Sequence, residues 1–327
     1  ERAGLLELTD TEFSSEKHLM RVIDKIVSAV GRRVDESHPY VDARLKDGSR
    51  FNAMVPPIAV DGALVSIRKF KNEKLSIDKL VEFGAMSDEM AAYLQAAVAC
   101  RLNILVSGGP GSGKTTTLNA LSSFIDNDER IATIEDTAEL QLKQIHVARM
   151  ESRPPNVEGR GEVNQRDLLR NALRMRPDRI IVGETRGDEV IDMPQAMNTG
   201  HDGSMTTIHA NSPRDALSRL ENMIMMSGVD MPLRATRAQI SSALDVVVQI
   251  KRLQDGSRRI VAISEMAGME GEVISMQDIF KFEVQNTDSD GKIIGEFLPT
   301  GLRSTHTQRF VQWGYNLPTS IYTRAAQ

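Results

Sequence analysis

The chain has 327 residues, of which 40% are hydrophobic and 26% charged, with a net charge of -5 at pH 7. This length exceeds the usual size of one domain, so we expect two domains with modest cores. The acidic balance excludes a protein that coats nucleic acid or an anionic membrane over its whole surface. The single cysteine, Cys100, excludes an internal disulfide and predicts a reduced core thiol in a reducing compartment.

The first ninety or so residues predict a small α/β module. Residues 14–31 carry an apolar stripe at helical spacing. Residues 40–57 alternate apolar and polar side chains around Asp47-Gly48, which is typical of a β-hairpin, and residues 63–70 predict a further strand. We therefore expect a small domain of one helix and several strands.

A connecting segment with a short helix, residues 72–90, is expected to contain the domain boundary. We assign residues 1–85 to the N-terminal domain and linker, and residues 86–327 to the second domain. The chain begins at Glu1 rather than Met, so we expect it to be part of a longer one. It has no apolar run of the roughly 18–20 residues that cross a bilayer and no signal peptide, which predicts a soluble, cytoplasmic protein.

The second domain is expected to begin with a helix at about Ser87. Short apolar strands then alternate with helices, in the order "NILVSG", "RIATIED", "RIIVGE" and "GSMTTIHA". Such alternation predicts an α/β fold with a mostly parallel sheet wrapped by helices. The last seventy residues predict further strands, with turns at Gly268 and Gly291.

A glycine-rich segment, "GGPGSGKTTT", follows the first of these strands and opens a helix. It fits the pattern G-x-x-x-x-G-K-[ST], in which backbone N–H groups surround phosphates, a lysine neutralises them and a hydroxyl binds Mg²⁺. A purely structural turn is the competing interpretation. The residues assigned to nucleotide binding are Gly108, Gly109, Pro110, Gly111, Ser112, Gly113, Lys114, Thr115 and Thr116. We expect ATP or another nucleoside triphosphate, with Mg²⁺.

Carboxylates end two of the other predicted strands. Glu135, Asp136 and Glu139 follow one strand, and Glu184 follows another after Gly183, where nucleotide-hydrolysing enzymes usually carry Asp. Carboxyl ends of parallel strands meet at one edge of a sheet, the edge where ligands bind. The acids can arrange Mg²⁺ and its water there, or they form a solvated acidic turn.

Two histidines lie in "TGHDGSMTTIHANS". His209 follows a predicted strand at the same edge, where a neutral imidazole can sense or orient a phosphate. His201 lies before that strand and fits either a functional role or a cap of the "TGHDG" turn.

These segments resemble the four motifs of the secretion-superfamily ATPases, which power type II secretion, type IV pili, archaeal flagella and type IV secretion. The Walker A loop, the acidic "Asp box", the Walker B strand ending in Gly-Glu and the "His box" occur in order over roughly residues 103–220. The chain looks most like the CpaF/TadA branch of tight-adherence (Flp, type IVc) pilus ATPases, through "DGSRFNAMVPPIAVDGALVSIRKF" and "GSMTTIHANSPRDALSRLE". The resemblance implies a PAS-like N-terminal domain and a RecA-like P-loop ATPase domain with a C-terminal β/α extension.

The resemblance also implies roles for particular residues. Catalytic roles fall on Glu184, Glu135, His209, Arg68 and Arg50, the two arginines reaching the γ-phosphate from the N-terminal domain. Mg²⁺ ligation, partly through water, falls on Thr115, Asp136 and Glu184. One of a run of arginines is expected to reach a neighbouring subunit, although a solvated helix face explains most of them: Arg153, Arg160, Arg166, Arg170, Arg174 and Arg176.

Partners follow from the same resemblance. We expect a homo-hexamer, peripheral to the bacterial inner membrane, that acts on membrane platform proteins and indirectly on pilin, with no direct contact to nucleic acid. With one cysteine, the chain cannot carry the cysteine-rich zinc insertion usual in type II secretion members. A VirB11-like type IV secretion ATPase is the main alternative, followed by a hexameric DNA translocase and a non-catalytic scaffold. Extension and retraction of a pilus both stay open.

Overall fold

The computed structural model describes residues 7–69, 75–156 and 158–324. The chain divides into two compact units, Glu1–Glu73 and Lys74–Gln327. Within the described residues, no helix is both long enough and apolar enough to cross a membrane.

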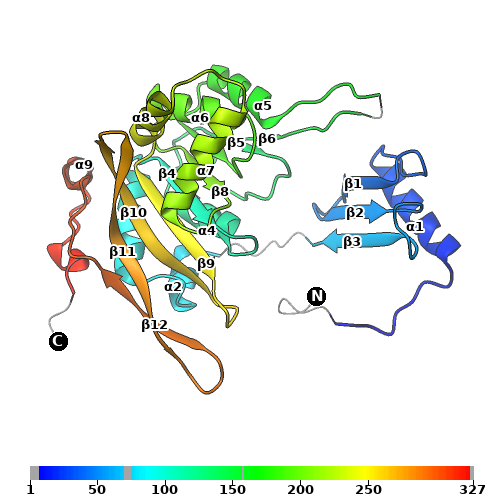
Figure 1. Ribbon diagram of the computed structural model, residues 1–327, viewed down its shortest axis with the longest axis horizontal. Helices are drawn as coiled ribbons and strands as arrows, with labels where there is room; N and C mark the ends of the chain where they lie inside the picture. The colour runs from blue at the N-terminus through cyan, green and yellow to red at the C-terminus, as the bar shows by residue number, and fades with distance from the viewer. Residues whose placement is uncertain (1–6, 70–74, 157, 325–327) are drawn as a thin grey trace. The chain divides into compact units, whose positions relative to one another are not determined.

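The first unit packs one helix on an antiparallel sheet of order β1-β2-β3 (Figure 1). Its elements are α1 (Glu16–Ala29), β1 (Tyr40–Arg44), β2 (Arg50–Met54) and β3 (Leu64–Arg68). The hairpin expected at Asp47-Gly48 is confirmed, since Gly48 adopts a φ of 87° between β1 and β2. Ile23 and Val27 of α1 pack with Phe51 of β2 in the core of this unit.

The short helix α2 (Ile77–Glu82) belongs to the second unit rather than to the first. Its Ile77 and Leu80 join the core cluster formed around α3 (Asp88–Ala99). Apolar burial therefore places the division between units before α2, whereas the sequence analysis places it after residue 85. Phe70, the expected end of the third strand, and Asn72, the expected start of the connecting segment, lie outside the described residues.

The second unit alternates strands and helices up to β9 and ends in long antiparallel strands. Its further helices are α4 (Lys114–Ser122), α5 (Gln165–Ala172), α6 (Glu189–Asn198), α7 (Pro213–Met226), α8 (Leu233–Ala243) and α9 (Thr307–Gln312), with 3-10 turns η1 (Leu173–Met175) and η2 (Thr319–Tyr322). Its strands are β4 (Ile104–Gly108), β5 (Ile131–Glu135), β6 (Val147–Glu151), β7 (Arg179–Val182), β8 (Met205–Ile208), β9 (Val246–Arg252), β10 (Arg258–Glu270), β11 (Val273–Thr287) and β12 (Ile293–Pro299).

These strands form one sheet of order β12-β11-β10-β9-β4-β8-β7-β5-β6. The six neighbouring strands β9, β4, β8, β7, β5 and β6 pair in parallel, whereas β9, β10, β11 and β12 pair antiparallel. The mostly parallel α/β sheet is therefore confirmed. The strands β4, β8, β7 and β5 lie next to one another in the middle of the sheet, which brings their carboxyl ends to one edge.

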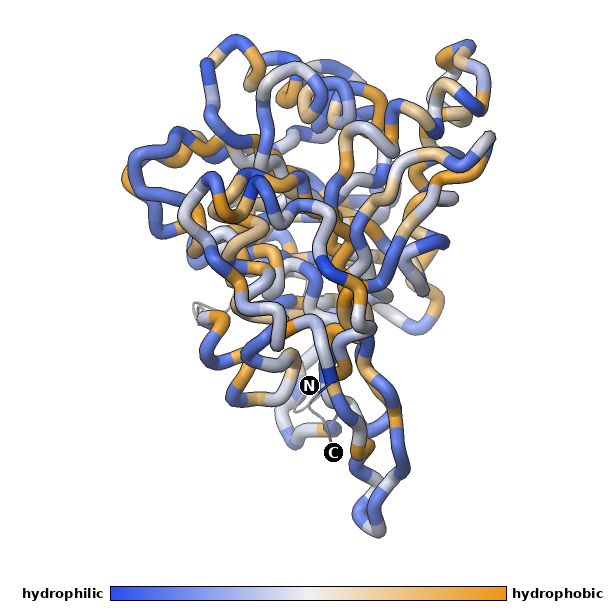
Figure 2. The backbone as a smooth tube through the Cα atoms, turned by 90° about the vertical axis from the view of Figure 1, so that its left-hand side faces the viewer, coloured by the Kyte–Doolittle hydropathy of each residue, from blue (hydrophilic) through white to orange (hydrophobic). Residues whose placement is uncertain are grey.

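Helices cover both faces of the parallel strands. Ile104 and Val106 of β4 pack with α3 and α4, while Leu105 between them packs with α5 to α8 on the other face. Because successive side chains of a strand alternate, burial on both faces explains the continuous apolar runs of these strands. Figure 2 shows hydrophobic and hydrophilic stretches alternating along the backbone, with hydrophilic stretches in many of the outer loops.

Two details differ from the sequence analysis. Gly268 lies inside β10 beside a shift in its pairing with β11, so the turn expected there is wrong; the strands turn at Gly271 instead, with a φ of 64°. The turn at Gly291 is confirmed. The edge strand β6 was not expected, because its side chains are only partly buried and carry no strong alternation.

Candidate active site

The glycine-rich segment forms the loop between β4 and α4. Space or backbone conformation requires a glycine at two of its positions: a Cβ on Gly108 would collide with the carbonyl oxygen of Ile250, and Gly113 adopts a φ of 104°. Ser112 Oγ donates to the Gly109 carbonyl at 2.8 Å and stabilises the turn. Lys114 begins α4, so the free N–H groups of the helix start lie directly after the loop, where they favour an anion.

Lys114 is buried and reaches across this loop. Its Nζ donates to the Gly109 carbonyl at 3.1 Å and lies 3.4 Å from His209 Nδ1. Burial lowers the pKa of Lys114, and the nearby Glu184 carboxylate opposes that shift. The lysine is therefore held beside the loop as a poorly hydrated cation, which strengthens its attraction for a phosphate.

His209 joins Lys114 to Glu184. It follows β8, and its Nε2 lies 3.1 Å from Glu184 Oε1. Burial and the neighbouring lysine lower the pKa of His209, which favours the neutral ring. An ammonium group can only donate, so Nδ1 accepts from Lys114 and Nε2–H donates to Glu184. The three side chains form one hydrogen-bonded chain from the glycine-rich loop to the end of β7.

Glu135 and Asp136 point in different directions at the end of β5. Glu135 is buried, and its Oε1 accepts hydrogen bonds from the backbone N–H groups of Glu139 and Leu140 at 2.8 and 2.9 Å. Burial outweighs these bonds and raises the pKa of Glu135 to about 7. Asp136 instead accepts a hydrogen bond from Ser152 Oγ at 2.7 Å and forms an ion pair with Arg186.

Gly183 has a steric reason to be glycine. A Cβ at this position would lie 2.9 Å from Glu135 Cγ. The side chain of Glu135, on the neighbouring strand, thus fills the space that an Asp at position 183 would need. The glycine and the buried glutamate are a complementary pair, and their contact explains why β7 ends in Gly-Glu.

The other residues assigned from the sequence belong to several elements. Thr115 and Thr116 follow Lys114 in the first turn of α4. Arg50 and Arg68 belong to the first unit, where they face each other across β2 and β3. His201 lies before β8, at the opposite end of that strand from His209. Its buried Nδ1 has no hydrogen-bond partner among the described residues.

The run of arginines is partly engaged within the chain. Arg166 and Arg170 pair with Asp192 of α6 at 2.5 and 3.4 Å, and Arg153 donates to the Gly161 carbonyl at 2.7 Å. These contacts hold α5 on α6 and close the loop that follows β6. The ion pairs account for the two arginines of α5 without a neighbouring subunit.

Three arginines near the site were missed by sequence reasoning. Arg258 of β10 donates to the Gly111 carbonyl at 3.0 Å, and Arg186 pairs with Asp136. Arg219 of α7 adds to the lowering of the pKa values of Lys114 and His209, which burial dominates. No local pattern marks Arg258, because the contact spans 147 residues of chain.

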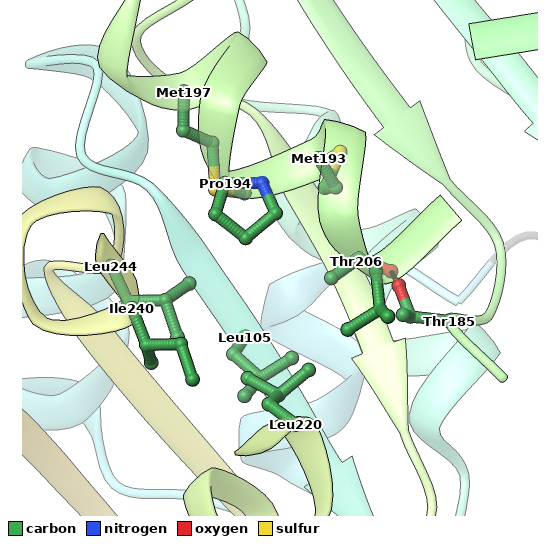
Figure 3. A pocket seen from close by; sticks show the side chains of 10 residues that line it. Leu105, Thr185, Met193, Pro194, Met197, Thr206, Leu220, Ile240 and Leu244 are labelled. Carbon is green, nitrogen blue, oxygen red and sulfur yellow. Dashed lines mark hydrogen bonds between the residues drawn. The ribbon is translucent and has the colours of Figure 1, made fainter. Parts of the chain in front are cut away.

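A small cavity lies behind the end of β7 (Figure 3). Its volume is about 20 Å³, enough for about one water molecule. The lining is apolar except for two hydroxyls, of Thr185 and Thr206, whose oxygens lie 2.8 Å apart. The cavity lies among α6, α7, α8 and β4 and has no room for a nucleotide.

The fold is that of a RecA-like P-loop ATPase domain preceded by a small N-terminal domain. Residues 5–290 match the model of the family described as type II/IV secretion system protein, and the chain belongs to this family. The Mycobacterium tuberculosis protein Rv3659c, whose name assigns it provisionally to conjugal transfer, is 38% identical over 274 residues, or 82% of this chain and 77% of that protein.

Two further comparisons bear on this family. The type IV secretion system protein VirB11 of Bartonella henselae is 31% identical over 281 residues, or 75% of this chain and 79% of that protein. The crystal structure of the pilus retraction motor PilT with bound ADP matches with a TM-score of 0.53 and 25% identity, and covers 73% of this chain and 68% of that chain. The relatives therefore include both secretion and pilus proteins.

Proposed function

We propose that this chain is a motor ATPase that hydrolyses ATP to do mechanical work on a membrane-embedded secretion or pilus assembly. The observation that carries the proposal is the chain of contacts from Lys114 through His209 to Glu184, at 3.4 and 3.1 Å, beside the glycine-rich loop. It joins a phosphate-binding cation to a carboxylate that can orient water. Phosphoryl transfer needs little beyond such placement and charge compensation.

The residues present fit ATP and Mg²⁺. Residues 108–116 would surround the phosphates, Lys114 would pair with the β- and γ-phosphates, and Glu184 would orient the attacking water and accept its proton. Mg²⁺ would neutralise phosphate charge beside the Thr115 hydroxyl and Glu184. Asp136 would contribute through water, which requires Arg186 to release it. Glu135, with one buried carboxylate oxygen that has no partner among the described residues, would help to order this water shell.

Arg50 and Arg68 are proposed to supply charge to the γ-phosphate from the first unit. Their cross-strand pairing places two cations at one end of the small sheet. Closing the units on ATP, and reopening them after product release, would convert hydrolysis into motion. Only a difference in nucleotide affinity between the closed and open states can drive such motion. We propose that the two units are the moving parts of a homo-hexamer at the inner membrane, with their division before α2 and not at the boundary between residues 1–85 and 86–327 expected from the sequence.

The particular machine has two candidates. A tight-adherence (CpaF/TadA) pilus motor acting on platform proteins and pilin is supported by the segments around Arg50, Arg68 and Glu184. A VirB11-like motor for conjugal transfer is supported by the names of two relatives that the chain matches over at least three quarters of its length. Genes for pilin, prepilin peptidase and platform proteins beside this one would favour the pilus motor. A neighbourhood of conjugation genes would favour the alternative.

The ATPase assignment is tested with two variants. Lys114→Ala is expected to abolish hydrolysis because the loop loses its phosphate-binding cation. Glu184→Gln is expected to bind Mg²⁺-ATP like the wild type but to lose turnover by about 10²-fold or more, since the amide cannot accept the proton. Phosphate release and nucleotide binding are measured on both. Wild-type turnover in the Glu184→Gln variant would contradict the catalytic role.

A further inference from the structure

Residue Thr207 of β8 forms two hydrogen bonds with the end of β7, beyond the last paired residues of the two strands. The parallel pairing of β7 with β8 ends at Val182 and Thr206. Past this point, Thr207 Oγ1 donates to the Gly183 carbonyl at 2.8 Å, and the Thr207 carbonyl accepts from Thr185 N–H at 2.8 Å. One residue of β8 thus binds the backbone on both sides of Glu184.

The face on which Thr207 lies leads to the glycine-rich loop. Met205 packs in the cluster with α3 and α4, whereas Ile208 packs in the cluster with α6 and α7. Because side chains alternate along a strand, Thr207 shares the face of Met205, and His209 is the next residue on that face. Thr207 is 1% exposed, so its hydroxyl has no water to replace the Gly183 carbonyl.

Glu184 needs such a restraint. Its side chain is 32% exposed, and the ion-pair partner shown for it is His209. The preceding residue is glycine, which leaves the backbone the widest freedom of any residue. The orientation of the peptide groups beside Glu184 therefore depends on the two bonds to Thr207, together with the bond from Gly183 N–H to the Ile134 carbonyl at 2.8 Å.

We propose that Thr207 is a positioning residue for ATP hydrolysis: its hydroxyl holds the Gly183 carbonyl and thereby directs the carboxylate of Glu184 towards His209 and the attacking water. This inference rests on the proposed ATPase function. Catalytic groups must keep their geometry closely, and a misplacement of about 1 Å can cost on the order of 10²-fold in rate. The hydroxyl is expected to matter for turnover and little for nucleotide binding.

The opposite face of the same strands provides a matched control. Thr185 Oγ1 and Thr206 Oγ1 lie 2.8 Å apart and line the small cavity in Figure 3. Both residues are buried, like Thr207, but neither hydroxyl bonds to Gly183. Replacing both with valine removes a buried hydrogen-bonded pair without leaving either hydroxyl unpaired, which costs little. It also removes the 3.5 Å contact from Thr206 Oγ1 to the Thr207 carbonyl, which keeps its hydrogen bond from Thr185 N–H.

The experiment compares Thr207→Val, Thr207→Ala, Thr207→Ser and the double variant Thr185→Val/Thr206→Val in the full chain. Steady-state hydrolysis of Mg²⁺-ATP gives kcat and KM, and calorimetric titration gives the Kd of ADP. Both hydroxyl-free variants at position 207 are expected to lose kcat by about 10- to 100-fold with KM and Kd within about twofold of wild type. Thr207→Ser and the double variant are expected to keep kcat within about threefold.

The outcomes separate the two levels of inference. A wild type without Mg²⁺-dependent turnover contradicts the ATPase assignment and this role with it. If the wild type hydrolyses ATP and either hydroxyl-free variant keeps that turnover, the Thr207 role alone is contradicted. An equal loss in the double variant, or a loss shared by Thr207→Ser, would show a packing effect and also overturn the role. Thermal unfolding of each variant shows whether it is still folded. Complete loss of the fold in a Thr207 variant is not expected from a positioning role.

Discussion

Replacing Gly183 with alanine adds one methyl group next to the buried side chain of Glu135, at the end of β5. The new Cβ would lie 2.9 Å from Glu135 Cγ. Neither side can yield easily, because Gly183 N–H is bonded to the Ile134 carbonyl at 2.8 Å and the Glu135 carboxylate is bonded to two backbone N–H groups. Gly183 is not among the glycines with positive φ, so the cost comes from the contact and not from backbone strain.

The expected loss of stability follows from the cost of overpacking a buried contact. One extra methyl group in a packed interior typically costs about 1–3 kcal/mol. For a domain of this size class each kcal/mol lowers Tm by about 2–4 °C, which gives a decrease of roughly 2–12 °C. Differential scanning calorimetry without nucleotide measures the change. Hydrolysis is expected to fall as well, since Glu184 follows the displaced residue.

The contact itself is tested by a double-mutant cycle with Glu135→Ala. This substitution removes Cγ, so the methyl group introduced at position 183 then has space, and Gly183→Ala should cost less in the Glu135→Ala background than in the wild type. A Tm unchanged by Gly183→Ala would refute the steric argument. An equal decrease in both backgrounds would assign the cost to some other contact.

Three further predictions concern Glu135, Arg68 and Arg258. Burial raises the pKa of Glu135 from 4.5 to about 7, so its stabilising proton is fully bound below pH 4.5 and lost as the pH rises through 7. In the wild type, the unfolding free energy should therefore fall by up to about 3 kcal/mol between pH 4.5 and 7, and Glu135→Gln should abolish this fall. Urea unfolding without nucleotide measures it, and an unchanged pH dependence in the variant would contradict the prediction. Arg68→Ala should slow hydrolysis by about tenfold or more while ADP binding changes less, and equal losses would exclude a γ-phosphate role. Arg258→Ala removes the hydrogen bond to the Gly111 carbonyl and should weaken ADP binding by about 2- to 10-fold at similar kcat; an unchanged Kd by calorimetry would show that this bond does not order the loop.

Local features of the chain were predictable because their causes are local. The loop of residues 108–116 needs particular residues at consecutive positions, and the hairpin at Asp47-Gly48 needs a glycine at the turn, where φ is 87°. The strands β4, β5, β7 and β8 are recognisable as apolar runs because they are buried on both faces. An edge strand such as β6 lacks this signal and was missed.

Tertiary structure decided which side chains meet. β5 lies beside β7 although β6 and α5 separate them along the chain, and only this order brings Glu135 against Gly183. The same holds for Arg258, which reaches the Gly111 carbonyl from β10, and for Asp136, which pairs with Arg186. A strand's carboxyl end can be read from the sequence, but its neighbours in the sheet cannot.

The sequence by itself determined that the chain has a glycine-rich loop between a strand and a helix, an alternating α/β domain, and acids and an imidazole at strand ends. These follow from the residue spacing that backbone geometry requires. Only the tertiary structure decided that Gly183 leaves room for Glu135 and that His209 joins Lys114 to Glu184. It also decided that Thr207 binds the peptide groups beside Glu184. The physical reason is that strand order and packing, which depend on contacts between distant parts of the chain, set these distances.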